Sequence, residues 1–353
     1  MATDPKLQRE NSLQNQHPQL EAARRADAAD AVMQVVQLAT GYWFSRCLQA
    51  VSEIGVADAL SDAPRSAADL AQAVGADRDS LNRVLRLLSS QGVFAFGDSG
   101  YSHTPLSRAL RSDHPHSLRS YVRFVGSPLF WDSYAEMEHV IRTGQTGVSK
   151  IEPRGVFAYF NDHPAIIALF NDAMRGKAES AIGPVLGAYD FSGFATVADI
   201  GGGLGHLLKA ILQTAPQTRG ILFDQPHVVA QVAPADRLEL QGGDFFRGPL
   251  PPSDCYVLME VLHDWTDEQC VAILRQVRTT APVHAKLLIV ETVLPPDNRP
   301  HFAHHLDINM MVLTGGRERT PDEFARLFAE SGFQLTRAIP TRGVYAIIEA
   351  ATA

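Results

Sequence analysis

The sequence predicts an α/β protein in which a doubly wound sheet follows a mostly helical N-terminal unit of the winged-helix type. Strand-like and helix-like segments alternate after residue 194, and this alternation is typical of a sheet whose strands are mainly parallel. Two short helices and a β-hairpin come one after another within residues 53–103, which is the order of a winged helix. A chain of 353 residues is long enough to form both units.

The composition argues against several classes of protein. Hydrophobic residues make up 45% of the chain, which supports a buried core, and the formal net charge of −8 argues against non-specific nucleic-acid binding. The three cysteines show no C-x-x-C spacing, so neither a disulfide framework nor a zinc site is indicated. The N-terminus lacks a signal-peptide pattern, and no apolar run approaches the length of a membrane span. We therefore predict a soluble, cytoplasmic protein with neither nucleic acid nor membrane as a partner.

The first part of the chain divides into an arm and a domain. Residues 1–28 are rich in Gln, Asn and charged residues, and we predict a flexible arm there. Residues 29–117 are predicted to form the winged-helix domain, which opens on a helix with a broad apolar stripe. Such a stripe needs a cover, and either a partner subunit or a neighbouring helix would provide it. The stripe consists of Val32, Val35, Val36, Leu38, Trp43, Phe44, Leu48 and Val51.

Within this domain, Ser66 is predicted to cap a helix that ends at Gly75, and a second helix follows at residues 79–91. Residues 93–101 have the pattern of a β-hairpin wing. Winged helices commonly bind DNA, but residues 65–100 contain four Arg, four Asp and no Lys. Because this stretch is electrically neutral, we expect a structural or dimerising role.

Residues 118–193 are predicted to be a helical linker that contributes to a substrate pocket. Aromatic side chains are dense here and form either core or the walls of a pocket. They are Tyr121, Phe124, Phe130, Trp131, Tyr134, Phe157, Tyr159, Phe160 and Phe170.

A glycine-rich turn organises residues 194–353, which we predict to be the ligand-binding catalytic domain. The strand 197–200 enters a helix through the pattern Asp199-x-Gly201-x-Gly203-x-Gly205, which brings backbone N–H groups close to a ligand. A dinucleotide fingerprint requires a further glycine at position 206, where the chain has His206. The acid at Asp199 suits a cationic ligand and repels a pyrophosphate.

The carboxyl ends of the following strands carry the other chemically interesting residues. Strands are predicted at 220–223, 238–241, 256–259 and 286–290, helices with capping boxes begin at Thr266 and Thr320, and two strand-like runs close the chain at 334–348. Because parallel strands end at one edge of a sheet, five of these residues should meet there. They are Gly201, Asp224, Asp244, His263 and Glu291.

The residue types at this edge indicate specific roles. Asp224 follows Asp199 by 25 positions, a spacing that suits an acceptor for ribose hydroxyls. Asp244 beside Phe245 suits an adenine. His263 can take a proton from a phenol-like hydroxyl, and either Glu291 or Glu318 could orient it. His301, His304 and His305 have no carboxylate or Cys companions at ligand spacing, so no metal is predicted.

Taken together, five motifs resemble those of the S-adenosylmethionine-dependent O-methyltransferases, of the plant caffeate and isoflavonoid type and their bacterial relatives acting on phenazines and polyketides. The resemblance covers nearly the whole chain after about residue 30. It implies a Rossmann-like methyltransferase sheet, S-adenosylmethionine as cofactor with S-adenosylhomocysteine as product, a small aromatic hydroxyl acceptor, and a homodimer whose N-terminal domain contributes to the partner's pocket. The motifs are Asp199-Ile-Gly-Gly-Gly-Leu-Gly205, Asp224-Gln-Pro226, Gly243-Asp-Phe-Phe246, Val261-Leu-His-Asp-Trp265 and Gly315-Gly-Arg-Glu-Arg-Thr320.

The resemblance also implies roles for individual residues. His263 would be the general base, flanked by Glu291 and Glu318. The expected cofactor residues are Asp199, Gly201, Gly203, Asp224, Asp244, Phe245 and Met259. The expected acceptor residues are Phe170, Met174, Asp264, Trp265, Met310 and Met311. One departure concerns Met259, where plant members carry a Lys four residues before the histidine, so cofactor affinity is in question.

Three alternatives stay open from the sequence. One is a winged-helix transcription regulator that senses a ligand in its second domain, and another is a nicotinamide-dependent oxidoreductase. The third is a relative that keeps the cofactor fold but runs decarboxylation or hydroxylation in place of methyl transfer.

Overall fold

The computed structural model describes residues 30–353, apart from the side chains of residues 178–180. The arm predicted at residues 1–28 lies outside the described residues. The chain separates into two compact units, of which the first ends at Arg111 and the second comprises Ser112–Ala353.

The first unit has the winged-helix elements that the sequence predicts. Helix α4 (Ala67–Val74) is capped by the Ser66 side chain, which accepts the N–H of Asp69, and it ends at Gly75 in the left-handed conformation, with φ of 67°. The wing is an antiparallel hairpin in which Phe94 is paired with His103. The elements after the helical backbone of residues 30–39 are α2 (Gly41–Glu53), α3 (Val56–Ala59), α4 (Ala67–Val74), α5 (Arg78–Ser90), β1 (Phe94–Gly97), β2 (Gly100–His103) and α6 (Pro105–Arg108).

The apolar stripe predicted at the start of this unit is largely exposed in the single chain. Val32, Val35, Leu38 and Trp43 keep between 56% and 76% of their surface accessible, whereas Val51 is buried. A helix that exposes so many large apolar side chains has an uncovered face.

The second unit begins with helices that lead to the sheet. They contain the aromatic residues of the predicted pocket segment. The elements are α7 (Arg119–Val125), α8 (Pro128–Ala135), α9 (Met137–Thr143), η1 (Val148–Lys150), α10 (Val156–Asp162) and α11 (Pro164–Ala188).

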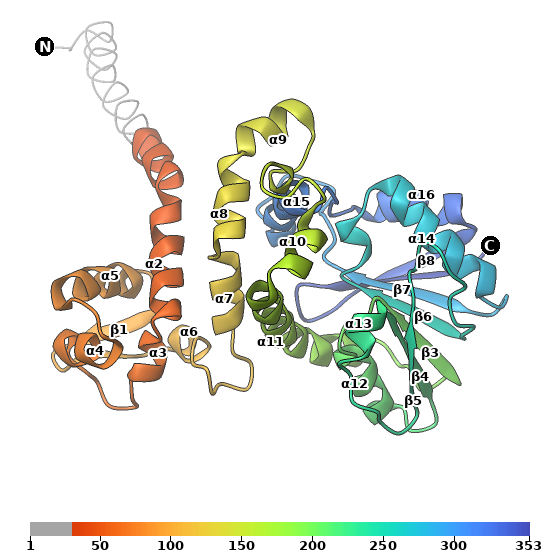
Figure 1. Ribbon diagram of the computed structural model, residues 1–353, viewed down its shortest axis with the longest axis horizontal. Coiled ribbons are helices and arrows are strands. Elements are labelled where there is room, and N and C mark those ends of the chain that lie inside the picture. Colours follow the sequence, from red (N-terminus) through yellow and green to blue (C-terminus); the bar gives the residue numbers. More distant parts are fainter. Residues whose placement is uncertain (1–29) are drawn as a thin grey trace, which may run out of the picture. The chain divides into compact units, whose positions relative to one another are not determined.

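A seven-stranded mixed sheet with the order β5-β4-β3-β6-β7-β9-β8 forms the body of this unit (Figure 1). Strands β3 to β7 are parallel, as predicted, whereas β9 is antiparallel to both β7 and β8. The two last strands form a hairpin because the connection between them is too short for a crossover helix. The strands are β3 (Thr196–Ile200), β4 (Arg219–Asp224), β5 (Leu238–Gly242), β6 (Cys255–Met259), β7 (Lys286–Glu291), β8 (Phe333–Pro340) and β9 (Ala346–Thr352).

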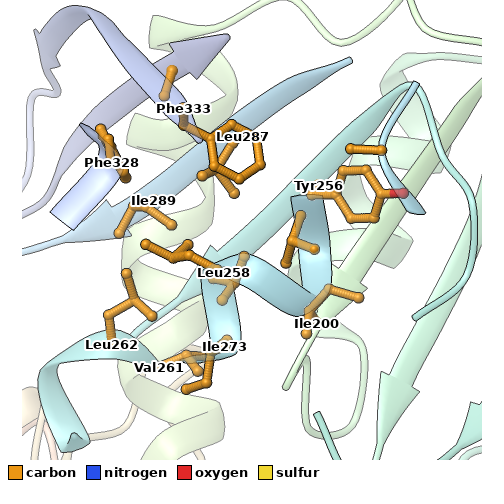
Figure 2. Packing of buried hydrophobic residues seen from close by; sticks show 14 of the residues in the cluster. Ile200, Tyr256, Leu258, Val261, Leu262, Ile273, Leu287, Ile289, Phe328 and Phe333 are labelled. Atoms are coloured by element: carbon orange, nitrogen blue, oxygen red, sulfur yellow. The ribbon is translucent and has the colours of Figure 1, made fainter. Parts of the chain in front are cut away.

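Helices cover both faces of this sheet. Along β6, Tyr256 and Leu258 face a core with α14 and α16, and Cys255 and Val257 face a core with α11 and α12, because side chains alternate along a strand. Figure 2 shows Leu258 packed among apolar side chains of the first core. The remaining helices are α12 (His206–Thr214), α13 (Pro226–Val229), η2 (Leu262–Asp264), α14 (Asp267–Thr280), α15 (Phe302–Leu313) and α16 (Pro321–Ser331). Over the described part of the chain, no helix combines the length and apolar character needed to cross a membrane.

Candidate active site

The glycine turn after β3 lies at the predicted edge of the sheet, close to the residues that follow β5 and β6. Gly201, Gly203 and Gly205 have φ of 70°, 59° and 73°, values that glycine adopts readily and other residues rarely. A Cβ on Gly201 would lie 2.9 Å from Val261 Cγ2 and 3.7 Å from Phe245 Cε1. The turn therefore packs against the residues that follow β5 and β6. It can approach them this closely because it lacks side chains.

Two carboxylates lie under this turn. Oδ2 of Asp224 accepts the N–H of Gly203 at 2.8 Å. Asp199 is buried, and among the described residues its Oδ1 has no hydrogen-bond partner. Burial, followed by the nearby charge of Asp224, raises the pKa of Asp199 to about 7. Burial also raises the pKa of Asp224. A ligand that carries positive charge would favour the ionised form of both acids, so the pair fits the amino-acid end of a sulfonium cofactor.

The predicted adenine side of the site is aromatic. Phe245 and Phe246 present their rings edge-on to Trp265, with ring centroids 5.9 and 4.9 Å away. Trp265 in turn stacks on Phe157 of α10 at 5.6 Å. Asp244 is half exposed and accepts the N–H of Phe246 at 2.9 Å. The structure thus places Trp265, which is expected to contact the acceptor, against Phe245, which is expected to contact the cofactor, and against its neighbour Phe246.

His263 lies at the centre of a buried cluster of carboxylates. Its Nδ1 is 2.8 Å from Oε1 of Glu318, and its backbone N–H donates to Oε1 of Glu291 at 3.1 Å. Its Nε2 is 4.0 Å from Oδ1 of Asp264. Glu291 and Glu318 are fully buried. Both acids that the sequence associates with His263 therefore contact it, Glu318 at the ring and Glu291 at the backbone.

The loop before α16 holds Glu318 in place. A Cβ on Gly316 would lie 1.9 Å from the carbonyl oxygen of His263, so the loop can approach that closely only with glycine at this position. The N–H of Arg317 donates to the same carbonyl at 2.9 Å. The N–H of Glu318 donates to Oδ1 of Asp307 at 2.9 Å. These contacts fix the carboxylate beside the imidazole.

Arg319 holds the other side of the His263 turn. Its guanidinium is fully buried and donates to the carbonyl oxygens of Leu262 at 3.0 Å and Trp265 at 2.8 Å. It also contacts Oδ1 of Asp267 at 2.8 Å. A guanidinium presents several donors in one plane, so it can satisfy these acceptors together and fix the turn.

The electrostatics of the cluster favour a proton on His263. Burial alone would lower its pKa, but the hydrogen bond with Glu318 and the charges of Asp264, Glu291 and Glu318 outweigh it and raise the pKa to about 10. Burial raises the pKa of Glu291 to about 7 and that of Asp264 to about 6. Within residues 30–353, Oε2 of both Glu291 and Glu318 lacks a hydrogen-bond partner. The cluster holds excess negative charge, which a cation would relieve.

The residues expected at the acceptor lie around an aromatic cluster of helices α7, α8, α10, α11 and α15. Phe170 packs on Phe124 and Phe160, with ring centroids 5.4 and 5.0 Å away. Met174 is partly buried against the same cluster. On α15, Met310 is buried and Met311 is half-buried. Phe124, Phe130 and Phe160 are core residues, as the more conservative interpretation of the aromatics expects.

Met259, where the cofactor affinity is in question, packs partly buried against the apolar core beside α11 and α12. The residue after it, Glu260, forms an ion pair with Lys177 of α11. Neither Lys177 nor Glu260 is indicated by a sequence pattern, and the same holds for the contacts of Arg319 and Asp307. The left-handed turn at Glu260 and the fully buried arginine depend on tertiary contacts that no local pattern signals. For the described residues, no group of His, Cys, Asp and Glu is arranged to hold a metal ion.

Comparison with known proteins identifies the family of this chain. The family model for the O-methyltransferase domain matches residues 134–334. The family model for the O-methyltransferase dimerisation domain matches residues 36–113. The phenazine O-methyltransferase of Lysobacter antibioticus is 42% identical over 334 residues, which cover 92% of this chain and 98% of that protein. The 3-amino-4-hydroxybenzoate 4-O-methyltransferase of Streptomyces cremeus is 35% identical over 324 residues, covering 89% and 88%.

A solved structure extends the similarity to the fold. The crystal structure of a methyltransferase of calicheamicin biosynthesis, in its S-adenosylhomocysteine-bound form, has a TM-score of 0.85 at 33% identity and covers 92% of this chain and 98% of that one. These similarities displace the regulator and the oxidoreductase that the sequence left open. The chain belongs to the S-adenosylmethionine-dependent O-methyltransferases, in the branch that carries an N-terminal dimerisation domain.

Proposed function

We propose that this enzyme transfers a methyl group from S-adenosylmethionine to a hydroxyl of a small aromatic acceptor, with His263 as the general base. The observation that carries the proposal is the contact between His263 Nδ1 and Glu318 Oε1 at 2.8 Å. When Nδ1 donates to the carboxylate, Nε2 is the nitrogen that can receive the acceptor's proton. A base oriented by an acid is the usual arrangement for proton abstraction.

The proposed reaction is a direct transfer of a methyl group from sulfur to oxygen. When bound, S-adenosylmethionine supplies an electrophilic methyl group on a positively charged sulfur. The acceptor oxygen forms the new O–C bond as the S–C bond breaks, and its proton goes to Nε2 of His263. General-base help is typically worth about 10²–10⁴-fold, and alignment of the two reactants roughly 7–11 kcal/mol of barrier. Positioning by the pocket therefore contributes at least as much as the base.

The positive charge of the cofactor would also lower the pKa of the base. The cluster around His263 and the pair Asp199–Asp224 both carry uncompensated negative charge. Positive charge close to these acids lowers the pKa of His263 and of the acids themselves. We propose that binding of the cationic cofactor frees Nε2 for the acceptor's proton. Gly201, Gly203, Asp224, Asp244, Phe245 and Met259 would hold the remainder of the cofactor.

The aromatic cluster supports an aromatic acceptor. Phe170 and Met174 lie partly exposed at its border, where they can contact a flat ring, and Met310 and Met311 of α15 would add to this wall. The relatives named above methylate a phenazine and a hydroxybenzoate. Phenazines and hydroxybenzoates are thus the first acceptors to test, followed by quinones and flavonoids.

A homodimer is part of the proposal. The dimerisation-domain match covers residues 36–113, and the exposed stripe at Val32, Val35 and Leu38 offers an apolar face that a second copy would cover. Light scattering after size exclusion should give twice the 38.5 kDa mass of the chain. A monomer at micromolar concentration would contradict this part.

The decisive experiment is a methyl-transfer screen read by mass spectrometry, run with the wild type and with His263→Ala. We expect a methylated product from at least one aromatic hydroxyl, and a loss of about 10²–10⁴-fold in turnover for the variant. Calorimetry with S-adenosylhomocysteine should give nearly the same affinity for both proteins. Wild-type turnover in His263→Ala would refute the base. Cofactor binding with no methylated product from any acceptor class would favour the relatives that run other reactions.

A further inference from the structure

A buried ion pair lies beside the base and has no part in the mechanism described so far. Lys177, on α11, contacts Oε1 of Glu260, which directly follows β6. The side chains keep only 19% and 16% of their surface accessible. The ring of Tyr345 lies 5.7 Å from the lysine Nζ. A buried pair of this kind costs desolvation energy and is weak evidence for stability, so its place in the site calls for another explanation.

The backbone at Glu260 is unusual as well. Its φ is 53°, in the left-handed region that residues other than glycine rarely adopt. Its N–H donates to the carbonyl oxygen of Val290 at 3.1 Å, which ties the turn to β7. Strained backbone persists where surrounding contacts hold it and is frequent at functional sites. Here the turn leads in three residues to His263, and the Lys177 contact fixes its side chain.

The charges in this part of the site face one another from several elements. His263 is faced by Glu318 on the loop before α16, by Glu291 at the end of β7, and by its neighbour Asp264. Glu260 is faced by Lys177, by His263 and by Tyr345, which together outweigh burial and lower the pKa of Glu260. Asp264 faces Lys177 too, and Arg319 faces Glu291. Lys177 is therefore a cation that compensates a carboxylate whose charge acts on the base.

We propose that Lys177 and Glu260 are positioning residues that set the proton affinity of His263 and fix the turn that carries it. Glu260 attracts a proton to the imidazole, and Lys177 limits that attraction by neutralising Glu260. The ion pair also joins α11, which carries Phe170 and Met174, to the turn of the base, so the acceptor wall and the base keep one register. The inference rests on the proposed function, because it requires His263 to be the base.

The two charges predict opposite effects, which a purely structural role would not produce. Lys177→Met leaves Glu260 uncompensated, so the acidic limb of the kcat–pH profile should move to higher pH by roughly one unit. Glu260→Gln removes a negative charge that attracts a proton to the imidazole, and the limb should move by a similar amount to lower pH. The double variant Lys177→Met/Glu260→Gln should return the limb close to the wild-type position. Lys177→Arg keeps the charge and should keep the profile.

A second lysine–glutamate pair provides the matched control. Lys286, at the start of β7, lies 3.7 Å from Oε1 of Glu349, and the length of the strand separates it from Glu291. Lys286→Met also removes a lysine charge paired with a glutamate, but at the far end of β7 from Glu291, and we expect it to leave the limb in place. A shift equal to that of Lys177→Met would refute the specific coupling.

Titration of the His263 imidazole by NMR gives a readout that needs no turnover. Its resonance is assigned by its loss in His263→Ala, and its pKa is compared in Glu260→Gln, in Lys177→Met, in Lys177→Arg and in the wild type. A lower pKa in Glu260→Gln and a higher one in Lys177→Met, with an unchanged one in Lys177→Arg, support the proposal. Equal values in all four, or shifts of one sign in Lys177→Met and Glu260→Gln, overturn it. Failure of the proposed function shows separately, as a wild type without methyl transfer or a fully active His263→Ala.

Discussion

Glu318 Oε1 lies 2.8 Å from Nδ1 of His263, although 55 residues separate the two along the chain. The contact exists because the loop before α16 presses against the backbone of His263 and orients both side chains within the same buried volume. It determines which nitrogen of the imidazole can serve the acceptor. It also raises the pKa of His263, and both effects can be measured.

Replacing Glu318 by Gln should alter the pH dependence of turnover. The amide keeps the shape but removes a negative charge, so the pKa of His263 should fall and the acidic limb of kcat should move to lower pH. At the plateau, turnover should drop by about 10–100-fold, because the orientation and basicity of the imidazole are impaired. Exposed Glu330→Gln serves as the control and should match the wild type. A limb that moves to higher pH would contradict the assignment of Glu318 to the charged cluster.

Cofactor binding should release protons near pH 7. In the cofactor-free protein the pKa of Asp199 and of Glu291 is about 7, so both acids are partly protonated at that pH. A cationic ligand favours their ionised forms. Calorimetry in two buffers with different ionisation enthalpies should show net proton release, larger for S-adenosylmethionine than for S-adenosylhomocysteine, whose sulfur is neutral. Proton uptake, or equal release for the two ligands, would count against this electrostatic account.

Asp199→Asn should stabilise the cofactor-free protein as the pH rises, while weakening cofactor binding. The pKa of Asp199 is raised from 3.8 to about 7, so the folded protein holds a proton that the unfolded chain loses between these values. The carboxylate therefore costs stability progressively from about pH 4 to pH 7. The variant should gain melting temperature over the wild type, and this gain should be larger at pH 8 than at pH 5. An advantage that does not depend on pH would show that the charge of Asp199 is not the cause.

Arg319→Met should destabilise the second unit and reduce turnover together. The change leaves the carbonyl oxygens of Leu262 and Trp265 without their buried donor, which costs roughly 1–3 kcal/mol for each group. Urea denaturation should therefore give a loss of about 2–5 kcal/mol in the free energy of unfolding. Arg326→Met removes an exposed arginine 3.7 Å from Glu323 and should cost less than about 1 kcal/mol. Similar losses for the two variants would disprove a special role of Arg319.

Much of this site follows from local patterns in the sequence. Gly201, Asp224 and His263 can be located because each lies at or shortly after the end of a strand with a clear hydrophobic pattern. Parallel strands then place them at one edge. Glu291 is found by the same logic. Glu318 is found because a glycine pair precedes it and because an imidazole that acts as a base calls for an acid.

Other parts of the site could not be predicted. Lys177 and Glu260 are 83 residues apart, and neither belongs to a spacing that suggests a pair. Arginine side chains usually lie at the surface, and only the packing of the His263 turn makes Arg319 fully buried. The sequence does not indicate that the Trp265 side chain packs on Phe245 and Phe246, although all three lie in the motifs of the site. These contacts depend on how the helices pack on the sheet, which local periodicity does not determine.

The placement of β9 has a consequence for the synthesis of the protein. This strand follows all the others along the chain, yet it lies between β7 and β8, with Ala346 paired opposite Glu291. On a ribosome, the glycine turn and the base would emerge while β7 still has an open edge. The nascent chain therefore exposes this edge of β7 until residues 346–352 are available to pair with it.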